Sequence, residues 1–325
     1  MQALGCEGEW KLTRVRRVTL VGLGAIGASY GEQFLAAPDV DLRVLVNEER
    51  KRRYEQSGVR VNGRRTDFPL YVPADAVEPA DLVLFCVKYD DLADAIEMVR
   101  GHVGPETIFL SLLNGIASEE DIQAAFPHHA VLHAISIAID AVREGRDVTY
   151  STLGSILFGD ATGRHADAVR AVRDVFERAG ISYETPDDIL RAVWWKFMIN
   201  VGVNQASAVL RAPYGVFQQS ADAREVMRMA MREVVAIAQK RGISLTEEDV
   251  RRFDDILNAM SPNGKTSMLQ DVEAGRPTEV EQFAGKVVEL GEQLGVPTPI
   301  NRLLYHAIRT IAPHERMPSA SPSSR

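Results

Sequence analysis

The chain has 325 residues, 46% of them hydrophobic and 25% charged, a composition typical of a globular protein with about two domains. Its formal net charge of −8 argues against a nucleic-acid-binding protein, because phosphate contacts need a basic surface. No stretch reaches the ~18 apolar residues of a membrane span, the N-terminus lacks a signal-peptide core, and the two cysteines, Cys6 and Cys86, suggest no disulfide framework. We therefore expect a soluble, cytoplasmic protein without nucleic-acid or membrane partners.

The first predicted elements are a strand, a glycine turn and a helix. A β-branched run at Val15–Val21 leads into a GxGxxG motif, and a helical pattern follows through Leu35. In such a turn the first glycine permits the bend, the second lets a pyrophosphate approach, and the third lets helix and strand pack closely. This context predicts a dinucleotide site made by Gly22, Leu23, Gly24, Ala25, Ile26 and Gly27. A glycine turn without a cofactor is the alternative.

The end of the second predicted strand, Leu42–Val46, bears on which dinucleotide is bound. An acidic residue there would bind the ribose diol of NAD, whereas a nearby cation accommodates the 2′-phosphate of NADP. Asn47 follows the strand, two glutamates come next, and Arg50 lies close behind. We predict NADP(H), with Arg50 as a phosphate contact. The alternative for Arg50 is to cap a solvated helix start.

The next segments are predicted to continue the sheet. After a β-hairpin that pairs Val59–Asn62 with Asp67–Leu70, three strands are expected at Asp81–Val87, Ile108–Leu112 and Val131–Ala138. The stretch from Val148 to Tyr183, with a helix near Arg164–Ala179, is expected at the edge of this domain.

Three residues stand at the ends of these predicted strands. Because ligands of open α/β sheets bind beyond the carboxyl ends of strands, Lys88, Asn114 and Ala138 are placed to line a cofactor. A loop cation and a turn-forming Asn-Gly remain the alternatives for Lys88 and Asn114.

From Asp187 onward helices are expected to dominate, beginning at Pro186-Asp187 with both Asp187 and Asp188 in the first turn. Lys196, Asn200 and Asn204 recur every fourth residue in an otherwise apolar stretch, which would place them along one helical face. Burying such neutral groups without partners costs roughly 2–7 kcal/mol each, and the charge more. The pattern predicts a small polar ligand; a protein network and a solvated face are the alternatives.

The remaining helices are predicted from periodicity and from glycine and proline breaks. Glu279 follows Pro277-Thr278, so it either occupies a helical first turn capped by Thr278 or takes part in catalysis. The Ser- and Pro-rich tail, Pro313–Arg325, is expected to be disordered. The predicted segments are a break at Pro213-Tyr214-Gly215, helices at Arg224–Arg241, from Thr246 and at Gly285–Leu294, and a last helix after Gly295–Pro299.

Taken together, these motifs resemble those of the ketopantoate reductase (2-dehydropantoate 2-reductase) family. VGLGAIG, VK, NG, KFMINVGVN, SMLQD and TE occur in this order over about residues 15–312. The resemblance implies an α/β fold, with an N-terminal Rossmann-type doubly wound sheet (15–185), an all-helical C-terminal domain (186–312) and flexible termini (1–14 and 313–325). It also implies NADPH-dependent reduction of 2-dehydropantoate to (R)-pantoate, for pantothenate and coenzyme A synthesis.

The resemblance also implies roles for single residues. Lys196 resembles the proton donor and Glu279 the acid that contacts cofactor and active site, while the substrate-binding groups are Asn200, Asn204 and Ser267. The glycine turn, Lys88, Asn114 and Ala138 resemble the cofactor positions. The chain departs from the family pattern at Tyr214, where an asparagine is frequent, and at Asn47, where a cation is expected.

The chemistry suits these residue types. Hydride attack on a ketone leaves negative charge on its oxygen, which a lysine ammonium can stabilise and protonate. Carboxamides and a hydroxyl give neutral donors for a small 2-oxo acid bound in an interdomain cleft, and a homodimer through the helical domain is possible. Three alternatives stay open: a reductase of another 2-oxo acid, a hydroxyacid or opine-type dehydrogenase, and a non-catalytic dinucleotide-binding sensor.

Overall fold

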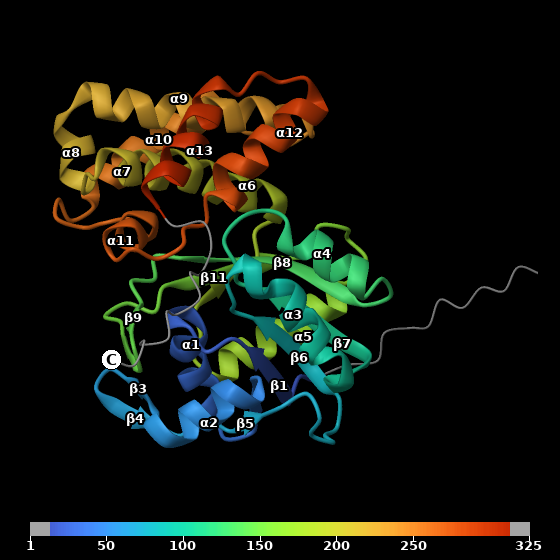
Figure 1. Cartoon of the computed structure of the whole chain (residues 1–325). Coiled ribbons are helices and arrows are strands. Elements are labelled where there is room, and N and C mark those ends of the chain that lie inside the picture. Colours follow the sequence, from blue (N-terminus) through green and yellow to red (C-terminus); the bar gives the residue numbers. More distant parts are fainter. Residues whose placement is uncertain (1–13, 313–325) are drawn as a thin grey trace, which may run out of the picture. The chain divides into compact units, whose positions relative to one another are not determined.

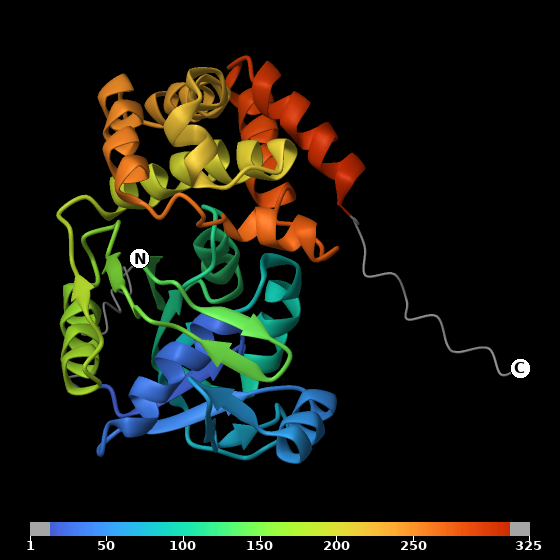
Figure 2. The same cartoon turned by 90° about the vertical axis from the view of Figure 1, so that its left-hand side faces the viewer.

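The computed structural model describes residues 14–312, which fall into two compact units that divide between Ile189 and Leu190 (Figures 1 and 2). Unit 1 is built of strands and helices, whereas unit 2 contains only helices among its described residues (Figure 2). The predicted fold class is therefore confirmed. The tail predicted to be disordered, Pro313–Arg325, lies outside the described residues. None of the helices between residues 14 and 312 combines the length and apolar character that a membrane crossing requires.

Unit 1 is organised around an eight-stranded sheet with the order β12-β11-β8-β7-β6-β1-β2-β5. The strands from β8 to β5 run parallel to their neighbours, whereas β11 is antiparallel to β8. The central strands are buried, which explains why β6 reads as an apolar run with no alternation. The strands are β1 (Arg17–Val21), β2 (Asp41–Leu45), β5 (Leu70–Tyr71), β6 (Ala80–Phe85), β7 (Val103–Ser111), β8 (Ala130–Ile137), β11 (Ser155–Gly159) and β12 (Tyr183–Glu184).

Helices cover both faces of this sheet, because successive strand residues belong to two separate cores. Leu20 and Leu84 lie in one core with the helices α1 and α5, while Val21 and Phe85 lie in the other with α3 and α4. This is the doubly wound arrangement that the resemblance implied. The helical segments are α1 (Ala25–Ala36), α2 (Glu48–Ser57), η1 (Tyr89–Asp91), α3 (Leu92–Val99), η2 (Arg100–His102), α4 (Ser118–Ala125) and α5 (Ala166–Arg178).

A second sheet, with the order β4-β3-β10-β9, joins two hairpins that are distant in sequence (Figure 1). The prediction that Asp67–Leu70 pairs with the first strand is wrong, since Val59 pairs with Thr66. Asn62 and Gly63 both have positive φ, 48° and 79°, so this Asn-Gly pair forms a two-residue turn and the chain resumes pairing at once. The strands are β3 (Val59–Val61), β4 (Arg64–Thr66), β9 (Val142–Glu144) and β10 (Asp147–Thr149).

Unit 2 begins with a helix whose predicted start is wrong. Asp187 and Asp188 are exposed and precede the helix, which starts at Ile189, the first residue packed into the interior. The predicted helix from Thr246 is confirmed, since Thr246 and Asp249 form a capping box. The segments are α6 (Ile189–Ile199), η3 (Asn200–Asn204), α7 (Gln205–Leu210), α8 (Tyr214–Gln219), α9 (Ala221–Lys240), α10 (Glu247–Ala259), α11 (Ser267–Glu273), η4 (Glu281–Gly285), α12 (Lys286–Leu294) and α13 (Pro299–Ile311).

The turn between β1 and α1 brings three backbone segments into close contact. Gly22 has φ +100°, and a Cβ there would lie 2.6 Å from the Cys86 carbonyl oxygen at the end of β6. A Cβ on Gly27 would lie 2.0 Å from the Gly22 carbonyl oxygen, whereas one on Gly24 would meet nothing closer than 3.8 Å. Gly22 and Gly27 are therefore required by packing, and Gly24 is not.

We expect Gly27→Ala to lower the free energy of unfolding by about 1–3 kcal/mol or more, because the new methyl group meets backbone that cannot move aside. Gly24→Ala is the matched control and should leave that free energy nearly unchanged. Urea unfolding followed by circular dichroism measures both. Equal stability of the two variants would contradict this account of the turn.

Candidate functional site

One candidate site lies at the carboxyl edge of the sheet in unit 1. From β1 the chain continues to β2 on one side and later returns to β6 on the other, which makes this edge a topological switch point. A small cavity of about 90 Å³ lies there. Residues at the ends of β1, β2 and β6 and on α2, η1 and α3 line it: Val21, Gly22, Leu45, Val46, Asn47, Arg50, Val87, Asp91, Asp94, Ala95 and Met98.

The glycine turn fits the phosphates of a dinucleotide. Gly24 precedes the first residue of α1 and makes no side-chain cap, and a Cβ there would meet only the Cys86 carbonyl oxygen, at an ordinary contact distance of 3.8 Å. The first turn of α1, Ala25 to Ala28, contains no acidic residue, so its backbone N–H groups and positive dipole end face no carboxylate of that turn.

Asn47 and Arg50 take different parts at the start of α2. Asn47 caps the helix, since its Oδ1 accepts a hydrogen bond from the Arg50 backbone N–H at 2.8 Å. The side chain of Arg50 instead lines the cavity and lies 3.5 Å from a carboxylate oxygen of Asp91. Arg50 and Gly22, the first residue of the glycine turn, therefore line one cavity, while the Asn47 side chain caps α2.

The other predicted cofactor residues follow β6, β7 and β8 at the same edge. Lys88 is exposed directly before η1, and Asn114 is half-buried in the loop after β7. Ala138 follows β8 with φ +54°, a left-handed conformation that is uncommon for residues other than glycine. Because these three strands are parallel neighbours, the three residues lie on the same edge as the glycine turn.

A separate candidate site in unit 2 is the polar line formed by Lys196, Asn200 and Asn204. Lys196 lies in the last turn of α6, and Asn200 to Asn204 form a π turn, η3. The expected regular α-helical spacing is therefore wrong beyond Ile199, because a π turn is wider than an α turn. π turns are frequent at functional sites.

The two carboxamides of this line lack partners in the protein. Asn204 is 6% exposed and Asn200 half-buried, yet neither side chain forms a hydrogen bond with another residue between 14 and 312. No polar side-chain atom of either amide is among those that are both buried and unpartnered, so these atoms border accessible space. These amides are therefore available to a polar ligand.

Ser267 belongs to a helix that packs against the end of the polar line and is anchored there by its neighbour Thr266. Helix α11 packs against η3 and α7, and the Thr266 hydroxyl lies 3.2 Å from the Ser207 hydroxyl of α7. Thr266 also caps α11 by accepting from the Leu269 N–H at 3.1 Å. Ser267 stands exposed as the first residue of that helix.

Glu279 is not a first-turn residue capped by Thr278. Helix η4 begins two residues later, Val280 takes the cap position, and no side chain caps it. The Glu279 carbonyl accepts from the N–H groups of Gln282 and Phe283 at 3.0 and 3.2 Å, so its backbone starts the helix. Its half-buried carboxylate is therefore not needed for capping.

A buried glutamine, which the sequence analysis missed, connects the two π turns. Gln205 is fully buried, and its amide donates to the Val201 carbonyl of η3 at 2.6 Å while its oxygen accepts from the Ala284 N–H of η4 at 3.0 Å. It also donates to Asn301 in α13, which in turn donates to Glu233 in α9 at 2.7 Å. The signal was a lone amide directly after Asn204 in a run of small apolar residues.

Tyr214, the departure from the family pattern, contacts the segment that leads to Ser267. Its N–H donates to the Gly264 carbonyl at 3.0 Å, and a Cβ on Gly264 would lie 2.9 Å from the Tyr214 ring. Burial raises the pKa of its hydroxyl, so Tyr214 is a neutral group at physiological pH.

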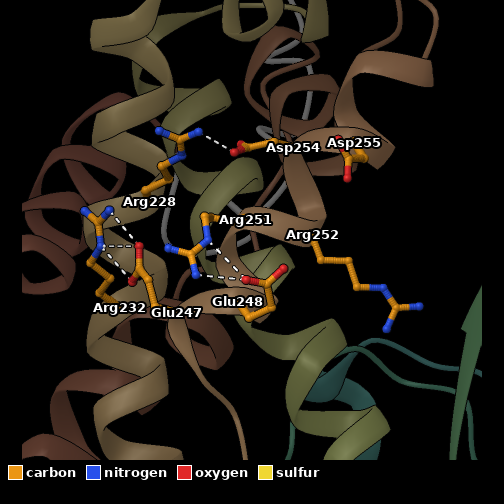
Figure 3. A pocket seen from close by; sticks show the side chains of 8 residues that line it. All are labelled: Arg228, Arg232, Glu247, Glu248, Arg251, Arg252, Asp254 and Asp255. Atoms are coloured by element: carbon orange, nitrogen blue, oxygen red, sulfur yellow. Dashed lines mark hydrogen bonds and ion pairs between the residues drawn. The ribbon is translucent and has the colours of Figure 1, made fainter.

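A larger cavity of about 460 Å³ lies between α9 and α10, and none of the predicted site residues is among those that line it (Figure 3). Its arginines are largely neutralised by acids in the same region: Arg232 pairs with Glu225 and Glu247, Arg228 with Asp254, and Arg251 with Glu248. Because these three arginines form ion pairs with acidic residues, their charges do not require an ionic ligand for neutralisation.

Comparison with known proteins places this geometry in a family. Residues 18–163 match the family described as ketopantoate reductase PanE/ApbA, and residues 188–312 match its C-terminal counterpart. A 2-dehydropantoate 2-reductase of Archaeoglobus fulgidus is 28% identical over 302 residues, covering 92% of this chain and 98% of that protein.

Solved structures agree with this assignment. The 2-dehydropantoate 2-reductase of Methylococcus capsulatus superposes with a TM-score of 0.78 at 27% identity, covering 90% of this chain and 96% of that one. A D-mandelate dehydrogenase bound to NADH and anilino(oxo)acetate has a TM-score of 0.82 at 19% identity, covering 90% and 97%, and so shares the fold. The chain belongs to the ketopantoate reductase PanE/ApbA family and is an oxidoreductase.

Proposed function

We propose that this protein reduces 2-dehydropantoate to (R)-pantoate with NADPH, a step of pantothenate and coenzyme A biosynthesis. The observation that carries the proposal is the pair of carboxamides, Asn200 and Asn204, that no described residue satisfies, on the same helical segment as Lys196. A small acid with an oxo group and a hydroxyl would give these donors and acceptors their missing partners.

The cofactor half of the proposal rests on the edge of the sheet in unit 1. The glycine turn (Gly22–Gly27) would hold the pyrophosphate, and the other contacts would be Arg50, Lys88, Asn114, Ala138 and Glu279. The bound dinucleotide supplies the hydride. The chain's own contribution there is to bind and orient.

In this proposal Lys196 is the proton donor. Reduction of a ketone builds negative charge on its oxygen, and a lysine ammonium within hydrogen-bond reach stabilises that charge and delivers its proton. Asn200, Asn204 and Ser267 would hold the carboxylate and hydroxyl of the substrate as neutral donors. Glu279 would support the charged form of the lysine, because a nearby carboxylate favours an ammonium.

A second candidate substrate is another 2-oxo acid, and Tyr214 is the observation that favours it. Its ring packs beside Gly264, three residues before Ser267, where it could narrow the substrate pocket or offer its own hydroxyl. An aromatic 2-oxo acid such as phenylglyoxylate is the clearest competitor, because a ring can stack on a tyrosine.

We expect Lys196→Ala to lower kcat by about 10²–10⁴-fold, because the proton donor is lost while the cofactor site is untouched. Stopped-flow NADPH oxidation measures kcat, and fluorescence titration measures the NADPH Kd, which should stay within twofold. Lys240→Ala, an exposed lysine at the end of α9, is the control and should keep full activity. A Lys196→Ala enzyme that is folded and close to fully active would refute this role.

We expect 2-dehydropantoate to be reduced with a higher kcat/KM than 2-oxoisovalerate, which lacks the hydroxymethyl group. A site that binds a hydroxyl leaves its own polar groups unpaired when that hydroxyl is missing. Steady-state rates for these two acids and phenylglyoxylate at saturating NADPH provide the comparison. A higher kcat/KM for either competitor would rule out the pantothenate assignment and leave the reductase mechanism intact.

We expect NADPH to be preferred over NADH, because Arg50 lines the cavity after β2 and no acid directly ends that strand. Arg50→Ala should narrow the ratio of the two kcat/KM values. Initial rates with both cofactors test this. A parent enzyme that uses them equally well would contradict it.

A further inference from the structure

Two arginines from distant parts of the chain stack on one buried tyrosine near the glycine turn. Tyr54, in α2, is 8% exposed. The guanidinium carbon of Arg53 lies 5.3 Å from the centre of its ring, and that of Arg143, in β9, lies 5.4 Å from it. Arg143 reaches this place because its hairpin, β9 and β10, pairs with β3, which directly follows α2.

Arg143 also touches the glycine turn itself. Its Nε donates to the Gly145 carbonyl at 2.9 Å, which fixes the side chain against its own hairpin. Its Nη1 donates to the carbonyl of Leu23, the second residue of the GxGxxG motif. These two hydrogen bonds hold the Arg143 guanidinium beside the glycine turn that we propose binds the dinucleotide.

No carboxylate neutralises this pair of arginines. Neither Arg53 nor Arg143 forms an ion pair with any residue between 14 and 312, whereas Arg64 and Arg65 of the same sheet pair with Glu32 and Asp67. In the charged cavity of unit 2, by contrast, three arginines form ion pairs with acidic residues (Figure 3). Like charges held together in this way favour an anion between them.

Arg50 lines the neighbouring cavity, where its charge is partly offset by the Asp91 carboxylate at 3.5 Å. Arg50 and Tyr54 are four residues apart in α2 and therefore share a helical face. Burial raises the pKa of Tyr54, but hydrogen bonding and charge from Arg143, hydrogen bonding from Arg53 and the charge of Arg50 together hold that pKa below its ordinary value. All three arginines therefore act on the Tyr54 hydroxyl.

We propose that Arg53 and Arg143, arranged on Tyr54, form with Arg50 a subsite for a phosphate monoester, the 2′-phosphate of NADPH. Planar guanidinium groups bind phosphate oxygens in pairs, and a dianion matches several converging positive charges. The subsite lies next to the end of β2, where dinucleotide-binding folds recognise the adenosine ribose. This inference rests on the proposed NADPH dependence and adds the residues that confer it.

The test is binding of two cofactor fragments, 2′,5′-ADP and 5′-AMP, to the full-length protein by isothermal titration calorimetry. We expect the parent to bind 2′,5′-ADP more tightly. Arg53→Gln and Arg143→Gln should each weaken 2′,5′-ADP binding about 10-fold or more, since each removes a charged hydrogen-bond donor, and leave 5′-AMP binding within twofold. Arg52→Gln, at an exposed neighbouring arginine on α2, removes the same charge and should change neither.

The outcomes separate the inference from the function it rests on. A parent that binds both fragments equally would overturn the NADPH preference and the subsite with it. A parent that prefers 2′,5′-ADP, with variants that keep the preference, would overturn the subsite alone. If the variants weaken the binding of both fragments equally, the arginines support the conformation of the glycine turn and do not bind the 2′-phosphate. That result would also overturn the subsite. Arg53→Gln keeps the test valid if Arg143→Gln fails to fold, because Arg53 is exposed.

Discussion

Gln205 forms hydrogen bonds to two π turns at once, and the arrangement of the polar line in unit 2 depends on this one buried amide. A π turn displaces backbone groups from the regular α-helical pattern, and buried backbone groups need partners. The Gln205 side chain binds one such group in η3 and one in η4. Through Asn301 and Glu233 the same network reaches α13 and α9. The hydrogen bonds of the Gln205 amide thus fix the segment in which the side-chain amides of Asn200 and Asn204 have no hydrogen-bond partner among the described residues.

The arginines near the two cavities differ in whether they form ion pairs with acidic residues. Between α9 and α10, arginines and acids pair within the protein, so a sizeable cavity there carries little net charge. Beside the glycine turn, Arg53 and Arg143 converge without acidic partners. Cavity volume alone would select the first region, whereas unsatisfied charge selects the second. For a protein that binds a small charged cofactor, unsatisfied charge is the more informative guide.

Much of the fold could be predicted from local sequence pattern. The glycine turn, the buried strands and the capping box at Thr246 each depend on interactions within a few residues. The errors arose where a competing local rule decided the outcome: Asn62-Gly63 made a tighter turn than expected, and burial of Ile189 set the start of α6. The sequence analysis considered Asn47 only as a residue that affects the choice of cofactor, whereas its side chain caps α2.

The candidate site was predictable only in part, because some of it is made by tertiary contacts. Lys196, Asn200 and Asn204 stand out in sequence as polar residues in an apolar run. Arg143 does not, since its position beside Leu23 depends on a hairpin that pairs with residues 87 positions earlier in the chain, a long-range pairing that local patterns do not reveal. The role of Gln205 could not be predicted from local sequence either, because its hydrogen-bond partners lie on η4 and α13.

The central claim is that the polar line of unit 2 binds the reacting acid, with Lys196 at its oxygen. A crystal structure of the ternary complex with NADP⁺ and pantoate tests this most directly. The account predicts the C2 hydroxyl oxygen of pantoate within hydrogen-bond distance of Lys196 Nζ, and the carboxylate or the other hydroxyl on Asn200 or Asn204. Pantoate bound elsewhere, with Asn200 and Asn204 still without partners, would contradict it.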